Sequence, residues 1–384
     1  MTLDFLYISL TITALSLLIL LFHYLVPYTA ILRFARRERR HRTIFTTEQP
    51  KVSVIVVTRN SDVELESYMP LLLQQTYPDY EVILVDDGSW DETQDVVRNL
   101  QEIYPHLYVT KIPQQSRIYS RRKLAITVGA KAAHGDILLL TEPSARPFSQ
   151  RWIETMVRNF TTGVEFVTGN CVVMDNGGFN QHLFAYDTLL RTMHATGFTA
   201  MGHPYTGSES NIAYLRSTFF ANDGFAGMLH QRFGDGDLMI NSHGNGLNTK
   251  VEPTLMAHTV CMDHPSHTLW RFMKRFELST LGDYRFGSLV SIFTEPVFRT
   301  LYYIGLVVSA LLLALTMPEW WMIGIYALAG SYLLKSFLLL LVVNLTATMY
   351  KQKRFWLSAL FFDIYVPVAT ICIRLFTRLP KHNI

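Results

Sequence analysis

The sequence is poor in cysteine and in charge. Its three cysteines lie far apart and form no CxxC pair, which excludes a disulfide framework and a cysteine-based zinc site and fits a reducing compartment. Charged residues make up 17% of the 384 residues, against roughly 25% in ordinary soluble domains. The formal net charge is only +3, so the composition gives no reason to expect a nucleic-acid partner.

Two glycine-rich phosphate motifs are also missing. No GxGxxG and no GxxxxGK[ST] follows any strand that the sequence predicts. Their absence disfavours a dinucleotide-dependent dehydrogenase and a P-loop NTPase. A nucleotide, if one binds, must therefore be held by other side chains.

Apolar residues gather at the two ends of the chain. Residues 6–26 form a nearly uncharged run of about 20 residues, which is enough to cross a bilayer core. We expect a retained membrane anchor at 1–28, followed by a basic juxtamembrane linker at 29–50 that contains six arginines. Positive charge beside a span marks its cytoplasmic side, so the segment that follows is expected in the cytoplasm.

The C-terminal region, 287–384, is expected to be a membrane region. Residues 301–315 and 321–343 predict two spans, and the basic cluster at 351–354 would then lie in the cytoplasm, as the charge rule requires. Residues 355–376 form a weaker candidate. A further full span would place the terminal basic residues outside, so this segment is either an exception to the rule or an interfacial or re-entrant helix.

The block between these regions, 51–286, predicts an α/β domain. Short β-branched apolar runs are typical of parallel strands buried on both faces, and they alternate with helical spacing. This order favours a doubly wound, mostly parallel sheet. The predicted strands are 52–57, 80–85, 107–112 and 137–140.

Polar side chains follow three of the predicted strands. Thr58 and Asn60 follow the first, Asp86 and Asp87 the second, and Glu142 the fourth. Ligands of such sheets bind at the carboxyl ends of the strands. An acidic strand end can hydrogen-bond a base or ribose, or help to hold a divalent cation.

In this arrangement the chain resembles a family 2 glycosyltransferase of GT-A fold, of the membrane-anchored bacterial type. The resemblance implies that Asp87 contacts the nucleotide base and that Thr58, Asn60 and Asp86 line the same pocket. It also implies that Arg122 or Lys123 contacts the diphosphate. A solvated start of a helix is the alternative interpretation of these two cations. The segments that carry the resemblance are 52–60, 74–82, Val-Asp-Asp-Gly-Ser at 85–89, 123–141, 204–214 and 233–238.

The family's metal motif, Asp-x-Asp, aligns with Glu142-Pro143-Ser144. Magnesium or manganese usually takes one or two carboxylates together with substrate phosphates. Glu142 can supply one carboxylate, whereas Ser144 offers only a neutral hydroxyl. The sequence therefore leaves open whether a divalent cation binds, and Arg146 is the candidate that would replace its charge.

Two acids follow the segment that resembles the sugar and acceptor pocket. Asp235 aligns with the expected catalytic base, and Asp237 is its alternative; a solvated Gly-Asp-Gly-Asp turn is the other interpretation. Lys274 and Arg275 lie where the family places another diphosphate contact, although Met273 and Phe276 replace the usual residues. An amphipathic interface helix explains that stretch equally well.

The resemblance implies an inverting glycosyltransferase of the bacterial inner membrane, with its catalytic domain in the cytoplasm. It would move a sugar from a nucleotide-diphosphate donor to a lipid-linked or glycan acceptor. The departures at Ser144, Met273 and Phe276 also motivate an alternative. In that alternative the protein is a catalytically weak or inactive relative that binds a nucleotide or glycan, or that scaffolds a partner.

Overall fold

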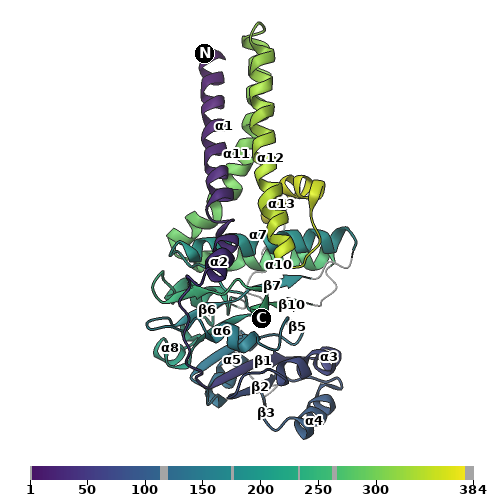
Figure 1. The fold of residues 1–384 in the computed structure, drawn as a ribbon. Helices are drawn as coiled ribbons and strands as arrows, with labels where there is room; N and C mark the ends of the chain where they lie inside the picture. Colours follow the sequence, from purple (N-terminus) through teal and green to yellow (C-terminus); the bar gives the residue numbers. More distant parts are fainter. Residues whose placement is uncertain (1, 113–119, 174–176, 232–233, 262–265, 377–384) are drawn as a thin grey trace.

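The computed structural model describes residues 2–112, 120–173, 177–231, 234–261 and 266–376. An α/β domain lies at one end of the molecule and long apolar helices project from it (Figure 1). The helices outside the projecting region are α3 Asp62–Leu73, α4 Thr93–Ile103, α5 Arg121–Ala132, α6 Trp152–Val157, α7 Phe179–Ala200, α8 Arg216–Ala221, α9 Asp237–His243 and α10 His267–Thr280.

The main sheet has seven strands in the order β3-β2-β1-β4-β8-β6-β9. β1 pairs in parallel with both β2 and β4, while β8 runs antiparallel to β4 and β6. The predicted doubly wound, mostly parallel sheet is therefore confirmed. The strands are β1 Val52–Thr58, β2 Tyr80–Asp86, β3 Leu107–Lys111, β4 Ile137–Thr141, β6 Phe166–Thr168, β8 Ile212–Leu215 and β9 Thr249–Val251.

Helices cover both faces of this sheet because the strands are apolar on both sides. Val54 of β1 packs into a core with α3, α4 and α6, whereas its neighbour Ile55 packs into a second core with α5 and α9. Successive side chains of a strand point to opposite faces. A second sheet has the order β5-β10-β7, formed by β5 Ala145–Pro147, β10 Thr259–Cys261 and β7 Cys171–Val173.

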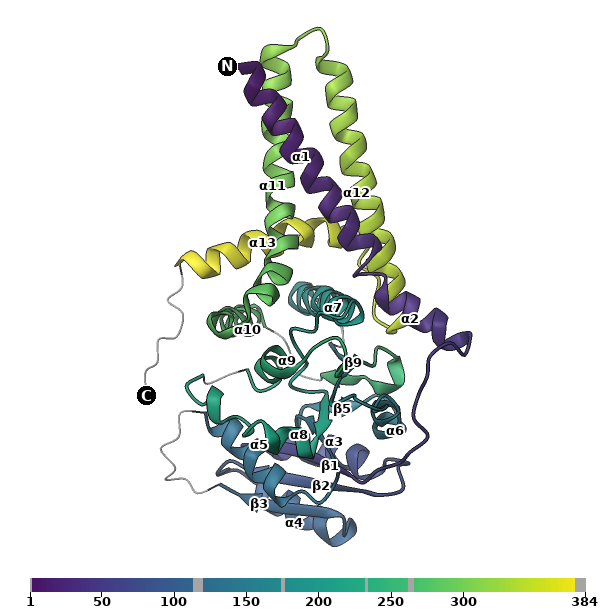
Figure 2. The same ribbon diagram turned by 90° about the vertical axis from the view of Figure 1, so that its left-hand side faces the viewer.

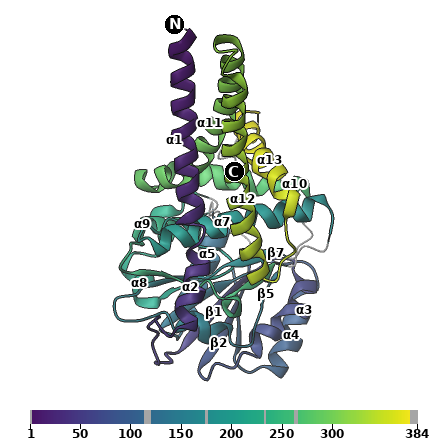
Figure 3. The same cartoon turned by 45° about the horizontal axis from the view of Figure 1, so that its top comes forward.

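Among the described residues, the projecting region contains four helical segments that are long and apolar enough to cross a membrane. Three helices, α1, α11 and α12, run side by side away from the domain (Figures 2 and 3), while α13 lies crosswise to them at their base (Figure 2). The interfacial alternative for residues 355–376 thus fits the arrangement better than a fourth span. The helices are α1 Thr2–Leu25, α11 Phe286–Thr316, α12 Trp321–Met349 and α13 Trp356–Phe376.

A layer of crosswise helices joins the domain to the projecting helices. α7 and α10 run across the molecule at this level (Figure 1). Buried residues of α1, α7, α12 and α13 belong to one continuous apolar cluster that also includes Trp270 of α10. Because this core extends across the junction, the position of the sheet relative to the projecting helices is fixed by packing and not by a linker.

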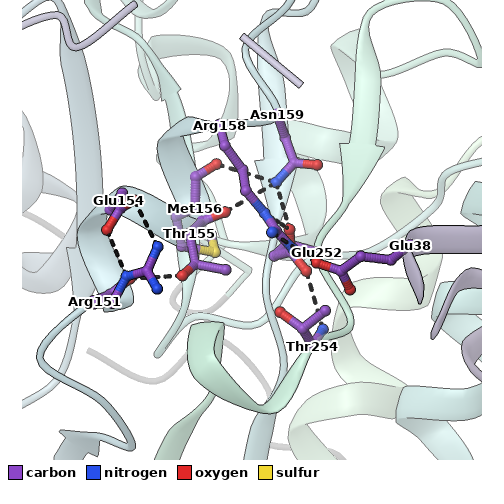
Figure 4. A network of polar contacts seen from close by, with 9 residues as sticks. All are labelled: Glu38, Arg151, Glu154, Thr155, Met156, Arg158, Asn159, Glu252 and Thr254. Carbon is purple, nitrogen blue, oxygen red and sulfur yellow. Dashed lines mark hydrogen bonds and ion pairs between the residues drawn. The ribbon is translucent and has the colours of Figure 1, made fainter. Parts of the chain in front are cut away.

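An ion-pair chain attaches the basic segment after the anchor to the domain (Figure 4). Glu38 of α2 (Ala30–Arg39) pairs with Arg158 at 2.7 Å. Arg158 in turn donates from Nε to Glu252 Oε2 at 2.8 Å, and its guanidinium lies 4.0 Å from the ring centroid of Phe45. Glu252 is fully buried, so it depends on these donors for its charge to be tolerated.

We expect Arg158→Ala to lower the free energy of unfolding by about 2 kcal/mol, because it leaves a buried carboxylate without its cation. Asn159 Nδ2 (2.8 Å) and the Thr254 backbone N (3.0 Å) would still donate to Glu252. Arg151→Ala is the matched control: its pair with Glu154 is exposed and should contribute less than about 1 kcal/mol. Thermal unfolding of the detergent-solubilised chain measures both, and equal effects would contradict the prediction.

Candidate active site

The ends of β1 and β2 form one side of the site. Thr58 and Asp86 are paired in the strand register, and both are buried. Asp86 Oδ1 accepts from the backbone N (2.9 Å) and Oγ (2.7 Å) of Ser89. The other oxygen, Asp86 Oδ2, and Thr58 Oγ1 have no hydrogen-bond partner among the described residues. Buried polar atoms normally have partners, so these two oxygens are candidate contacts for a ligand.

Asn60 shapes the turn beside these oxygens. Its φ is 52°, in the left-handed region that asparagine tolerates better than most residues. Its backbone N donates to Ser89 Oγ at 2.9 Å, and its side-chain Oδ1 accepts from the backbone N of Trp90 at 3.0 Å. Asn60 therefore fixes the loop at the strand ends, and its contact with a nucleotide stays a prediction.

Three successive cations open α5, and each has different partners. Arg121 Nε donates to Asp87 Oδ1 at 2.7 Å. Arg122 points to Asp235 and Glu142. Lys123 is buried, and its Nζ donates to the carbonyl oxygens of residues 228 and 231, both at 2.9 Å. Residues on a helix are about 100° apart around its axis, so neighbouring side chains leave in different directions.

This division separates site residues from structural ones. Lys123 is held by backbone carbonyls, and burial lowers the pKa of its ammonium despite nearby carboxylates, so its role is in the fold of the loop after α8. Arg122 and Arg121 are the cations at the strand ends. The sequence does not single out Arg121 as a site residue. It shows that Arg121 precedes Arg122 and Lys123, but it does not show in which direction each side chain points.

Arg122 joins the two carboxylates that the sequence assigns to different steps. Its Nε donates to Asp235 Oδ2 at 2.8 Å, and its Nη2 pairs with Glu142 Oε1 at 3.0 Å. Burial alone would lower the pKa of Arg122, but the charges of Asp235, Glu142 and Glu209 raise it. The guanidinium is thus permanently charged. It contacts both Glu142, the acid after β4, and Asp235, the predicted base.

Glu209 is a further acid at this place that the sequence analysis did not single out. Its segment is close to the Asp235 loop: a Cβ on Gly236 would lie 3.0 Å from the Glu209 backbone N. The neighbouring Ser210 donates from Oγ to Glu142 Oε2 at 2.9 Å. Burial and the nearby Asp235 raise the pKa of Glu209 well above its usual value, against the opposing effect of Arg122. Three acids, Asp235, Glu142 and Glu209, therefore lie around the guanidinium of Arg122.

Asp237 has a different environment from Asp235, although only one residue separates them. Its Oδ2 accepts from Tyr284 OH at 2.5 Å and from Thr280 Oγ1 at 3.1 Å. Burial raises the pKa of this carboxyl, an effect that the hydrogen bonds from Tyr284 and Thr280 oppose. The contacts attach the start of α9 to the end of α10, which is a structural role. Asp235 is the better placed of the two candidate bases.

Lys274 lies in the junction layer and not at the strand ends. It is buried, and its Nζ pairs with Asp187 of α7 at 2.9 Å and with Glu277 at 3.0 Å. Arg275, the next residue of α10, is half-buried. The contacts of Lys274 favour the interface-helix interpretation of this stretch over a diphosphate contact. Arg146 of β5 is half-buried and its side chain makes no ion pair within the described ranges, so it stays available to a ligand.

The residues present fit a cation only in combination with a substrate. In the described part of the chain, no three His, Cys, Asp or Glu side chains converge on one point. Glu142 is the carboxylate at the aligned position, and Arg122 and Ser210 already contact it. Because Mg²⁺ and Mn²⁺ often take one or two carboxylates plus substrate phosphates, Glu142 would serve as a protein ligand that shares the ion with a diphosphate.

Comparisons with known proteins agree with this geometry. Residues 53–222 match the model of the family described as Glycosyl transferase family 2. Glycosyltransferase AglE of Haloferax volcanii is 32% identical over 182 residues, which are 46% of this chain and 55% of that protein. A GalNAc(5)-diNAcBac-PP-undecaprenol beta-1,3-glucosyltransferase of Campylobacter jejuni is 28% identical over 134 residues, 34% of this chain and 41% of that one. The chain thus spans about half the length of these curated relatives.

A solved structure shares the fold over most of the chain. The mannosyltransferase PcManGT of Pyrobaculum calidifontis, in complex with GDP-Man and Mn²⁺, superposes with a TM-score of 0.55 at 17% sequence identity. The likeness covers 92% of this chain and 99% of that one. The likeness in fold, the family match and the acids at the strand ends all point to the same kind of protein, a glycosyltransferase. Residues 53–222 are thus similar to glycosyltransferase family 2, and the chain shares the GT-A fold of the mannosyltransferase, with four apolar helices among its described residues.

Proposed function

We propose that the protein is an inverting glycosyltransferase that moves a sugar from a nucleotide-diphosphate donor to a lipid-linked or glycan acceptor. One observation supports it most: Arg122 holds Asp235 beside the strand ends, where Thr58 and Asp86 have free buried oxygens. A donor nucleotide at the strand ends would place its sugar between these two groups.

In this proposal Asp235 acts as the general base. The acceptor hydroxyl oxygen attacks the anomeric carbon from the face opposite the diphosphate, and the bond from that carbon to the diphosphate oxygen breaks. Asp235 takes the hydroxyl proton, and the nucleoside diphosphate leaves with the bonding electrons. Pairing with Arg122 keeps Asp235 oriented. Preorganised cations such as Arg121, Arg122 and Arg146 would stabilise the charge on the leaving group, with a divalent cation on Glu142 adding to them when bound.

The helices support a place at the membrane surface. The basic segment after α1 and the cluster at 351–354 lie on the domain side of the projecting helices, and positive charge favours the cytoplasmic side. We therefore infer a domain in the cytoplasm at the inner membrane. The Campylobacter relative is named for a glycan on a diphosphate-linked polyisoprenol, which supports a lipid-linked acceptor here.

Calorimetric titration with UDP and with GDP, each with and without Mn²⁺, tests the donor half of the proposal. We expect one nucleotide to bind and Asp86→Ala to weaken that binding about tenfold or more, since the nucleotide loses a buried, charged hydrogen-bond acceptor. Binding that requires Mn²⁺ would support Glu142 as a ligand, and Glu142→Ala should then abolish the increase in nucleotide affinity that Mn²⁺ gives. Failure of both nucleotides and of intact nucleotide sugars to bind would contradict the proposal and favour an inactive relative.

A further inference from the structure

A cleft of about 220 Å³ lies between α10 and α13, apart from the strand ends. Its walls include His267, Trp270 and Arg271 from α10, and Tyr365, Cys372 and Phe376 from α13. The ring of Trp270 stacks on Tyr365 with centroids 6.1 Å apart and an interplanar angle of 29°. A ring nitrogen of His267 lies 2.9 Å from Tyr365 OH. The cleft is therefore a built feature with an aromatic wall that joins two elements.

The polar side chains of the cleft include one cation, Arg271, and the imidazole of His267. Arg271 is exposed, and no ion pair or hydrogen bond of its side chain occurs in the described part of the chain. Among the described residues that line the cleft, none is acidic. A guanidinium beside an imidazole favours an anion, and arginine binds phosphate with paired donors. The rest of the lining is apolar or aromatic, so the cleft combines a phosphate contact with a hydrocarbon contact.

The position of α13 indicates what kind of molecule carries that phosphate. Exposed apolar side chains follow one stripe of this crosswise helix at helical spacing. A helix that lies across a bundle of spans and exposes such a stripe is typical of the membrane interface. An amphiphile held at the lipid surface can reach the cleft by lateral movement. The stripe consists of Leu357, Phe361, Ile364, Val368, Ile371 and Leu375.

α10 connects the cleft to the candidate base. Its last residue, Thr280, donates to Asp237 at 3.1 Å, and Asp237 begins α9 two residues after Asp235. Arg271 lies nine residues earlier on the same helix, about 14 Å along its axis at 1.5 Å per residue. A phosphate at Arg271 is therefore separated from the base. The reacting hydroxyl belongs more naturally to a sugar attached to the lipid phosphate than to the phosphate itself.

We infer that the α10–α13 cleft binds the phosphate-bearing head of the lipid-linked acceptor, an isoprenoid diphosphate that already carries sugar. Arg271 contacts the phosphate, the aromatic wall contacts the first isoprene units, and the attached glycan extends toward Asp235. This inference rests on the proposed function, because it assigns the acceptor half of the same reaction. It differs from a general attraction to anionic lipids because it requires one cleft and one cation.

Protection of Cys372 from a maleimide tests the cleft directly. Cys372 lines the cleft and is exposed, and replacement of Cys171 and Cys261 by serine leaves it as the labelled thiol of the full-length protein. In phosphatidylcholine nanodiscs, undecaprenyl phosphate should slow the labelling. Phosphatidylglycerol at the same mole fraction and inorganic phosphate should not. Equal protection by phosphatidylglycerol would overturn the inference in favour of a general anionic-lipid surface.

Arg271→Ala should raise the undecaprenyl phosphate content needed for half-protection by about tenfold, the loss of one charge-assisted contact. Arg374→Ala is the control: this exposed cation lies on α13 with its guanidinium 5.6 Å from the ring of Phe293, and its removal should have less than about a threefold effect. Unchanged protection in Arg271→Ala would overturn the inference. Both variants remove exposed side chains, so folding should be preserved, as the thermal unfolding profile would show.

Transfer assays separate the acceptor classes. Undecaprenyl diphosphate that carries a sugar should accept the transferred residue, whereas undecaprenyl phosphate should protect Cys372 without accepting. Transfer to bare undecaprenyl phosphate would contradict the glycan-bearing acceptor. The nucleotide titrations are independent of this cleft. If they fail while protection by the lipid persists and depends on Arg271, the donor chemistry is wrong and the lipid site stands.

Discussion

Asp235→Asn is expected to lower kcat for sugar transfer by about 10²- to 10⁴-fold, the usual contribution of a general base. Asparagine keeps an oxygen that can accept from Arg122 Nε, now 2.8 Å from Asp235 Oδ2, but it cannot take a proton. Nucleotide affinity should change little, because the oxygens proposed to contact the nucleotide belong to Thr58 and Asp86. Single-turnover transfer from a radiolabelled nucleotide sugar measures the chemical step apart from product release.

Asp237→Asn is the matched control, since it makes the same change one residue beyond Gly236. Its carboxylate is engaged by Thr280 and Tyr284, so we expect this variant to lower Tm while the rate of transfer falls far less than in Asp235→Asn. The reverse result, full transfer in Asp235→Asn and none in a folded Asp237→Asn, would exchange their roles. Absence of transfer by the unmodified protein with every donor would instead support the inactive relative.

The strand ends of the site could be predicted from the sequence because they depend on local pattern. Short β-branched runs fixed the strands, parallel order brought their carboxyl ends together, and the polar residues after them had to meet. Thr58, Asn60 and Asp86 lie together for that reason. The predicted strand limits also differ little from the observed β1, β2, β3 and β4.

Other parts depend on side-chain direction or on distant partners, which a single sequence does not contain. Three adjacent cations open α5, and only the structure shows that Lys123 faces backbone carbonyls while Arg122 faces Asp235. The sequence does not predict α7, because this helix is buried on most sides and its apolar residues do not form one clear stripe. Its Asp187 explains Lys274, which the resemblance had assigned to a diphosphate.

A second large effect is expected where α13 packs against α11 and α12, because four charged side chains are buried together there. Asp363 of α13 lies 3.3 Å from Arg299 of α11, measured from Oδ1 to Nε, and its other oxygen pairs with Lys335 of α12. Arg299 also pairs with Glu295, and the four residues are each less than 10% exposed. Two positive and two negative charges therefore balance within the cluster. Buried charges in proteins are normally paired in this way.

Asp363→Asn should lower the free energy of unfolding by about 3–5 kcal/mol, because it leaves two buried cations with one carboxylate between them. Adding Lys335→Met to this variant removes the excess cation and leaves the Glu295–Arg299 pair balanced. The double variant should therefore be more stable than Asp363→Asn alone, a positive coupling that thermal unfolding in detergent measures as a double-mutant cycle. Additive losses would mean that the charges do not act as one cluster.

Asp363 forms ion pairs that join α13 to both α11 and α12. The single variant should therefore also expose α13. Proteolysis in the 351–355 connection should become faster in Asp363→Asn and return toward the original rate in the double variant.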